Sequence, residues 1–113
     1  SAGAYASVAL VSALGGVGAY VTGSAVPSAA LFMASAAATG ESFGRLELFA
    51  ALQHSAAGHT AMASLPIIAI LLAALPERRP DDERSALRWG LVLASVWMVM
   101  VIASGWVQLA LAR

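Results

Sequence analysis

The chain has 113 residues, of which 60% are hydrophobic and only 11% charged, and its mean hydropathy is +0.82. Because about a quarter of the residues in a soluble domain are charged, this composition excludes an ordinary soluble fold and predicts an all-α integral membrane protein with one domain, residues 1–113. Six basic residues balance six acidic ones, so no basic surface indicates a nucleic-acid partner, and the lack of cysteine excludes disulfides and thiolate metal sites.

The first expected helix covers residues 4–22, which include no charged side chain and are about one bilayer long. Gly15, Ala19 and Gly23 recur every four residues, so their small side chains form a strip that another helix can approach closely. We expect close helix packing along this strip and beside Gly58. The segment lacks the basic flank of a secretory leader, so we expect no cleavable signal in it.

A turn is expected at residues 22–27, TGSAVP, because Gly23 and Ser24 break a helix and Pro27 suits the first turn of the next one. The second helix would cover residues 27–39 and stop at Gly40. It spans only about 20 Å, so it stops within the membrane, continues through residues 41–44, or lies at the interface. The sequence therefore predicts three or four transmembrane helices.

The third expected helix, residues 46–75, is longer than the roughly 20 residues that a crossing needs. Pro66 lacks an amide hydrogen and clashes with the preceding turn, which predicts a kink within residues 62–66. Pro76 ends the helix. The half before the kink carries Gln53 and the only two histidines of the chain, His54 and His59, whereas the half after it is aliphatic.

A charged loop is expected at residues 76–86, within the run ERRPDDERSALR of residues 77–88, which holds four of the six arginines. By the positive-inside rule this loop faces the cytoplasm, the matrix or the stroma, which suits a bacterial inner, mitochondrial inner or thylakoid membrane. Residues 87–111 form the last expected helix. Trp89 and Trp106 are about 26 Å apart along it, as two interfacial belts would be, and Trp97 lies between them and packs on protein, lipid or a flat ligand.

Three side chains of the third helix are candidates for cofactor binding: Gln53, His54 and His59. The two histidines are about 140° apart around a helix, so they cannot hold one metal ion together. Either could ligate haem or chlorophyll, bind a quinone, or serve as a hydrogen-bonding strut between helices. We favour His54 as a metal ligand, because Gly58 leaves space beside its ring.

No enzyme signature is present in the sequence: it has no GxSxG, phosphate loop or HExxH motif, and we expect no catalytic residue. Glu41, Arg45 and Glu47 are expected near one membrane surface as an anchor or ion pair. No Asp, Glu or Arg falls in the middle of an expected helix, which argues against an ion-coupled pump.

The run GGVGAYVTGSAVPS at residues 15–28 resembles the signature of the small transmembrane-protein-fourteen family, which includes the plastid fatty-acid-export proteins. The matching residues are Gly15, Gly16, Tyr20, Val26, Pro27 and Ser28. The resemblance covers about the first third of the chain. It implies a compact helical membrane protein of an organelle that moves fatty acids or a porphyrin precursor.

Three functions follow as hypotheses. The first is an accessory structural subunit of a respiratory, ATP-synthase or photosynthetic complex, which contacts membrane lipids and other transmembrane subunits through small-residue helix faces. The second, from the resemblance, is a free-standing carrier of fatty acids or porphyrin precursors. The third is a haem-binding membrane anchor subunit.

Overall fold

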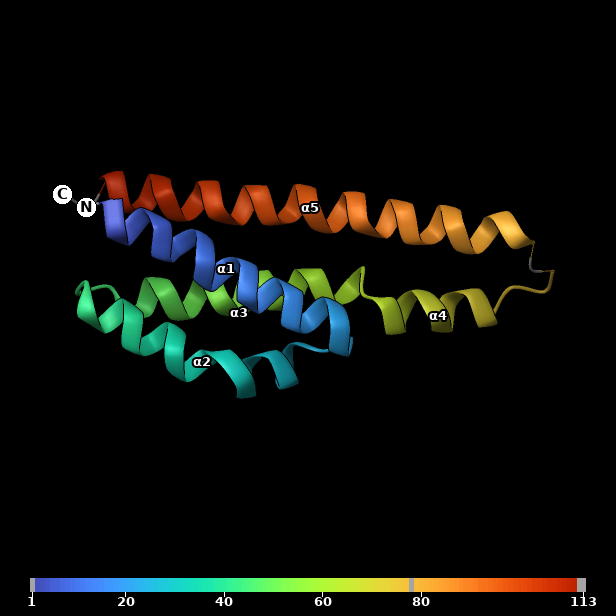
Figure 1. Ribbon diagram of the computed structural model, residues 1–113, viewed down its shortest axis with the longest axis horizontal. Coiled ribbons are helices and arrows are strands. Elements are labelled where there is room, and N and C mark those ends of the chain that lie inside the picture. The colour runs from blue at the N-terminus through green and yellow to red at the C-terminus, as the bar shows by residue number, and fades with distance from the viewer. Residues whose placement is uncertain (1, 78, 112–113) are drawn as a thin grey trace.

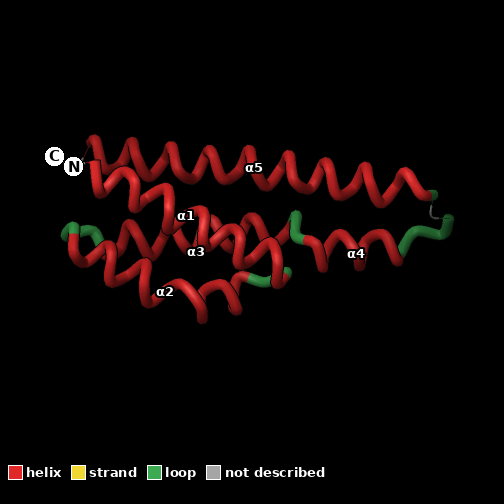
Figure 2. The backbone as a smooth tube through the Cα atoms, viewed as in Figure 1, coloured by secondary structure: helices red, strands yellow, loops and turns green. Residues whose placement is uncertain are grey.

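The computed structural model describes residues 2–77 and 79–111, and every regular element in this part of the chain is a helix. Short loops separate five helices (Figures 1 and 2): α1 (Ala2–Thr22), α2 (Ala25–Ser42), α3 (Leu46–Met62), α4 (Leu65–Ala73) and α5 (Pro80–Leu111). Three spans are long and apolar enough to cross a membrane, namely α1, α3 with α4, and α5. The all-α membrane fold is thereby confirmed.

The helices form an elongated bundle of 54 × 24 × 15 Å. Helices α1, α2 and α3 pack together over one half of its length, and α5 runs along the whole of it, beside α1, α3 and α4 (Figure 1). The start of α1, the α2–α3 turn and the end of α5 lie at one end, and the α4–α5 connection lies at the other (Figure 1). We call these the terminal end and the loop end.

Helix α2 is longer than the residues 27–39 predicted for it. The Ser24 side chain accepts a hydrogen bond from the Val26 amide and so caps the helix before Pro27. Gly40 does not stop the helix, which ends at Ser42. The bare backbone of Gly40 packs against Arg45 and Phe49, where a Cβ atom would lie only 2.7 Å from the Cβ of Phe49. At 18 residues, α2 is about 27 Å long, and it is not among the three candidate spans.

The predicted third helix, residues 46–75, is two helices in the structure. α3 ends at Met62, and the Ser64 side chain caps α4 by accepting a hydrogen bond from the Ile67 amide at 3.4 Å. Pro66 occupies the first turn of α4, where its missing amide hydrogen costs nothing. The kink predicted at residues 62–66 is therefore a full break, and α4 ends at Ala73, before Pro76.

Helix α5 begins earlier than predicted, and residues 80–86, assigned from the sequence to a charged loop, form its first two turns. Asp82 explains the difference: its carboxylate accepts a hydrogen bond from the Arg79 amide at 2.9 Å, as the third residue of a helix does in a capping box. Pro80 stands at the first helical position, where its fixed φ is suitable. The acidic first turn also complements the helix dipole.

A small core holds the bundle together around Phe49, which is fully buried between α1, α2 and α3. The core cluster consists of Val8, Val11, Ala36, Phe49, Leu52, Ala56 and Val101. Most of the large aliphatic side chains of α5 instead remain exposed, as expected for a helix that faces lipid. At the terminal end, the Trp106 indole donates a hydrogen bond to the Tyr5 carbonyl at 2.9 Å and ties α5 to α1.

Candidate functional site

Helix α3 carries all three predicted cofactor-binding residues, and the structure places them in three different environments. Gln53 is completely buried between α1 and α2. Its side-chain amide donates to the Ser28 hydroxyl at 3.2 Å, and that hydroxyl donates to the Gly15 carbonyl at 2.7 Å. Gln53 is thus a polar link among three helices, out of reach of a ligand.

Further buried polar atoms lie along the same helices. The side-chain amide oxygen Oε1 of Gln53 and the hydroxyls of Ser12 and Thr60 have no hydrogen-bond partner among the described residues. A buried polar group without a partner costs about 1–3 kcal/mol. The α1–α3 contact therefore combines the apolar core with buried polar atoms, of which Gln53 and Ser28 make hydrogen bonds.

His54, the residue favoured from the sequence as a metal ligand, lies on an exposed face of α3. Its ring makes no hydrogen bond to any described residue, so nothing fixes its orientation. Gly58, one turn further, is also exposed, and a Cβ atom added there would meet nothing within 4 Å. Among the described residues no helix packs beside Gly58, and the close packing expected there stays a prediction.

His59 is also exposed, but its imidazole is held in place on two sides. Its Nδ1 lies 2.8 Å from the carbonyl oxygen of Ser55 one turn earlier, and because a carbonyl only accepts, Nδ1 carries the proton. The ring also stacks on the Trp97 indole of α5, with centroids 4.1 Å apart and planes inclined by 29°. The structure therefore makes His59, rather than His54, the better ordered imidazole.

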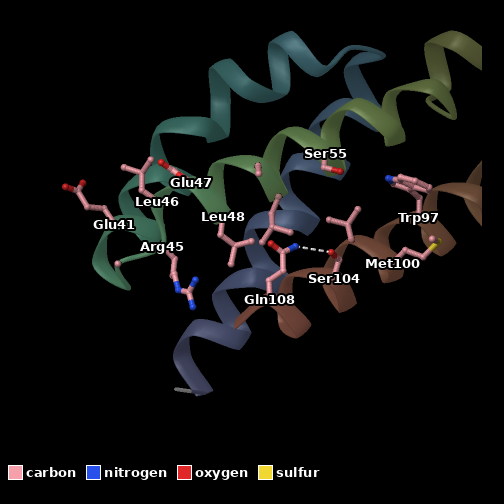
Figure 3. Close-up of a pocket in the computed structure, with 14 residues that line it drawn as sticks. Glu41, Arg45, Leu46, Glu47, Leu48, Ser55, Trp97, Met100, Ser104 and Gln108 are labelled. Carbon is pink, nitrogen blue, oxygen red and sulfur yellow. Dashed lines mark hydrogen bonds between the residues drawn. The ribbon is translucent and has the colours of Figure 1, made fainter. Parts of the chain in front are cut away.

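A groove of about 940 Å³ runs between α3 and α5 from the terminal end to Trp97 (Figure 3). Its polar lining residues include Glu41, Arg45, Glu47, Ser55, Ser104 and Gln108, and its apolar ones include Leu48, Leu52, Met100 and Val101. The Gln108 amide donates to the Ser104 hydroxyl at 3.1 Å inside it (Figure 3). Ligand pockets commonly measure about 300–1,000 Å³, so the groove is large enough for an organic cofactor.

The predicted cluster at the membrane surface lines the mouth of this groove. Glu41, Arg45 and Glu47 lie together at the terminal end, but the Arg45 guanidinium and the Glu41 carboxylate point in different directions (Figure 3). Among the described residues, no group of three potential ligands could hold a metal ion.

The predicted packing strip of α1 makes close contacts with other helices. Gly15 packs so tightly that a Cβ atom would lie 2.9 Å from the Gln53 carbonyl oxygen, and Ala19 is completely buried. Gly23 has a φ of +77° in the α1–α2 turn, where a Cβ atom would lie 2.9 Å from Pro66. Small side chains at these positions let α1 lie against α3 and α4.

Two contacts between helices could not be predicted from the sequence. In the sequence Ser28 is only one of the residues that match the family signature, and nothing in its neighbourhood indicates a bond to Gln53, 25 residues away. Trp97 was noted as a possible stacking residue, but its partner His59 lies on a different helix. Both contacts depend on how the helices pack, which no local pattern reports.

Fold and site together define an all-α integral membrane protein with a groove between α3 and α5. No protein-family model, curated protein or solved structure matches the chain. The resemblance to the transmembrane-protein-fourteen family therefore stays a prediction from the sequence.

Proposed function

We propose that this protein is an accessory structural subunit of a larger membrane assembly, and that the face of α3 around His54 and Gly58 packs against a transmembrane helix of another subunit. The observation that carries the proposal is that both residues are exposed on a candidate membrane-spanning helix, and that no described residue lies within 4 Å of a Cβ atom added at Gly58.

The free-energy cost of exposing the His54 imidazole to lipid without a hydrogen bond supports this proposal. Ionisable side chains within membrane spans almost always face other helices or a water-filled cavity, because hydrocarbon offers them no hydrogen bond. A helix from another subunit could supply that bond to His54 and could approach closely over Gly58, since glycine presents only backbone. Met62, one turn after Gly58, is exposed as well, so the uncovered surface extends to the end of α3.

Affinity purification from native membranes in a mild detergent tests the proposal. Wild-type protein should bring down a defined set of membrane proteins, and Gly58→Leu should lose them, because the added side chain fills the surface that the partner occupies. Gly58→Leu should still fold as wild type, since nothing within 4 Å obstructs it. Ala103→Leu, a similar enlargement at an exposed position of α5, is the matched control and should retain the partners.

Two outcomes would contradict the proposal. One is a wild-type protein that purifies alone and monodisperse under these conditions. The other is a Gly58→Leu variant that retains every partner while Ala103→Leu loses them, which would move the interface to α5. Identification of the partners also tests the predicted kind of assembly, a respiratory, ATP-synthase or photosynthetic complex, and the predicted location of residues 77–88 on its matrix, stromal or cytoplasmic side.

A second candidate function is a carrier of fatty acids or porphyrin precursors, and the groove between α3 and α5 favours it. The groove has a polar mouth at Arg45 and Glu47 and an apolar floor at Leu52 and Val101, an arrangement that suits an amphiphile. Protein reconstituted alone into liposomes should then move such a molecule across the bilayer. Flux no faster than in protein-free vesicles would count against this function.

A further inference from the structure

We infer that the groove between α3 and α5 is a lipid site, which holds an acyl chain of a zwitterionic phospholipid and places the ammonium group of that lipid beside Glu41 and Glu47. The inference goes beyond the proposed subunit role, because it rests on the groove and not on the exposed face around His54 and Gly58. It follows from the length of the groove, from the order of the residues along it and from the charge at its mouth.

The groove is about as long as one leaflet of a bilayer. Its lining on α5 begins at Trp97 and ends at Gln108, 11 residues later, which is about 16 Å along a helix. One leaflet contributes about 15 Å to a hydrocarbon core of roughly 30 Å. Trp106, next to the outer end of this lining, is expected at a membrane surface. The groove thus extends from that surface to the bilayer centre, as one acyl chain does.

The residues that line the groove change from charged to uncharged along this length. Glu41 and Glu47 lie at the terminal end, and Trp97 lies at the opposite end (Figure 3). The inner part is uncharged and consists of Ala51, Leu52, Ser55, Trp97, Met100 and Val101. A phospholipid has the same order, with its charged headgroup at the surface and its acyl chain toward the bilayer centre.

Between the two parts lies a side-chain amide. Gln108 donates one amide hydrogen to the Ser104 hydroxyl at 3.1 Å, and a primary amide has a second hydrogen to donate (Figure 3). Gln108 lies two residues beyond Trp106, near the membrane surface. The ester carbonyls of a phospholipid lie at this depth, between the headgroup and the chains. The second amide hydrogen of Gln108 therefore suits such a carbonyl.

The mouth of the groove carries an excess of negative charge. Glu41 and Glu47 are exposed there, and neither carboxylate has an ion pair or a side-chain hydrogen bond with a described residue. Arg45, the basic residue of the lining, already has an interaction, so we do not count it as an anion site. Two carboxylates at a partly screened surface attract a cation and repel an anion. The mouth therefore favours an ammonium group.

This charge distinguishes the phospholipid from other amphiphiles that the apolar part of the groove would accept. A fatty acid, which the second candidate function would carry, brings a carboxylate to the mouth, and phosphatidylglycerol brings an unbalanced phosphate. Both headgroups meet the like charges of Glu41 and Glu47. The phosphate of phosphatidylethanolamine is balanced by its own ammonium group, which can approach the two carboxylates.

Native mass spectrometry of the full chain, purified in a neutral detergent, tests the inference. The probes are phosphatidylethanolamine and phosphatidylglycerol with identical acyl chains, and palmitate as a competitor. Wild-type protein should retain one phosphatidylethanolamine and bind it about 3–10-fold more tightly than phosphatidylglycerol, since each exposed charge pair contributes up to about fivefold. Palmitate in equal amount should leave the bound phospholipid in place.

One pair of double variants tests the role of the charge. Glu41→Gln with Glu47→Gln should lower the affinity for phosphatidylethanolamine and bind the two phospholipids equally, because the mouth then has no free carboxylate among its described residues. Glu77→Gln with Asp81→Asn removes two exposed carboxylates at the loop end, outside the groove. This matched control should keep the wild-type preference.

A second pair of variants tests the position of the chain. Ala51 is exposed and lines the groove, so Ala51→Phe should fill the space without disturbing the core. It should weaken binding of both phospholipids by at least about tenfold, the effect of losing two buried methylene groups. Ala103→Phe enlarges an exposed residue of α5 outside the groove and should bind as wild type does. Circular dichroism checks that each variant is folded.

Three results would overturn the inference. The first is a wild-type protein that binds phosphatidylglycerol or palmitate as tightly as phosphatidylethanolamine. The second is a preference for phosphatidylethanolamine that survives in the Glu41→Gln, Glu47→Gln variant. The third is wild-type binding by Ala51→Phe, which would place the lipid elsewhere on the protein. Loss of the partner subunits in affinity purification would change none of these measurements, so the inference and the proposed function can fail separately.

Discussion

The hydroxyl of Ser28 on α2 lies between two partners, donating to the Gly15 carbonyl of α1 at 2.7 Å and accepting from the Gln53 amide of α3 at 3.2 Å. Ser28 and Gln53 are both completely buried, so neither finds water in place of the other. One hydroxyl therefore links three helices, in a bundle whose other buried polar atoms have few partners among the described residues.

Removal of this hydroxyl should destabilise the bundle. Ser28→Ala deprives both the Gly15 carbonyl and the Gln53 amide of a buried partner, and we expect a loss of about 1–2 kcal/mol, the usual range for hydrogen bonds between membrane helices. Unfolding in mixed micelles, followed by circular dichroism, measures the change. Ser35→Ala, at an exposed position of the same helix, should leave the unfolding free energy within about 0.5 kcal/mol of wild type. If both substitutions lowered the unfolding free energy equally, the loss would come from a weaker helix α2 and not from the hydrogen bonds of Ser28.

Substitution by alanine should change the stability of the bundle in opposite directions at two of its glycines. Gly15→Ala should destabilise by about 1–3 kcal/mol, because the new methyl would lie 2.9 Å from the Gln53 carbonyl oxygen, a backbone atom that cannot move aside. Gly58→Ala should stabilise the isolated chain by up to about 1 kcal/mol, since the space is open and alanine favours the helix. Thermal unfolding of both purified variants measures whether each substitution raises or lowers the stability. A destabilising Gly58→Ala would show that another group lies against α3 in solution.

The start of α5 should depend on one carboxylate. Asp82→Ala removes the acceptor of the Arg79 amide, and we expect the first turn to fray with a loss of up to about 1 kcal/mol of local stability. Hydrogen exchange of the amides in residues 81–84 should then speed up several-fold. Asp81→Ala, which removes an exposed charge from the same turn, should change the exchange far less. Equal rates in the two variants would mean that charge alone fixes the start of the helix.

The three tryptophans should report the depth of α5 in the bilayer. Trp89 and Trp106 are 17 residues apart, about 26 Å, and Trp97 lies midway, so it should lie near the bilayer centre while the others lie at the two surfaces. In single-tryptophan variants, lipids brominated deep in the acyl chain should quench Trp97 most, and lipids brominated near the headgroup should quench the other two most. Equal quenching of all three by shallow bromines would place α5 on the surface of the membrane.

The positions of the helices could be predicted from the sequence, because a bilayer requires every backbone polar group to bond within its own segment and long apolar runs can meet this only as helices. Their ends were harder to predict. The extension of α2 past Gly40, the break at Ser64 and the early start of α5 at Pro80 each depend on one side chain or one close contact. Such contacts cannot be recognised from the hydropathy of the sequence.

For the candidate site, helical periodicity alone determined that His54 and His59 face different directions and cannot share a metal, since 3.6 residues per turn places them about 140° apart. It could not determine which ring is held in place. That was decided when α5 packed against α3 and brought Trp97, 38 positions later in the chain, onto the face of His59. Hydropathy is a property of each residue, so it can be evaluated along the sequence alone. A contact between two helices depends on how each helix is rotated and shifted along its axis, and only the packed bundle determines this.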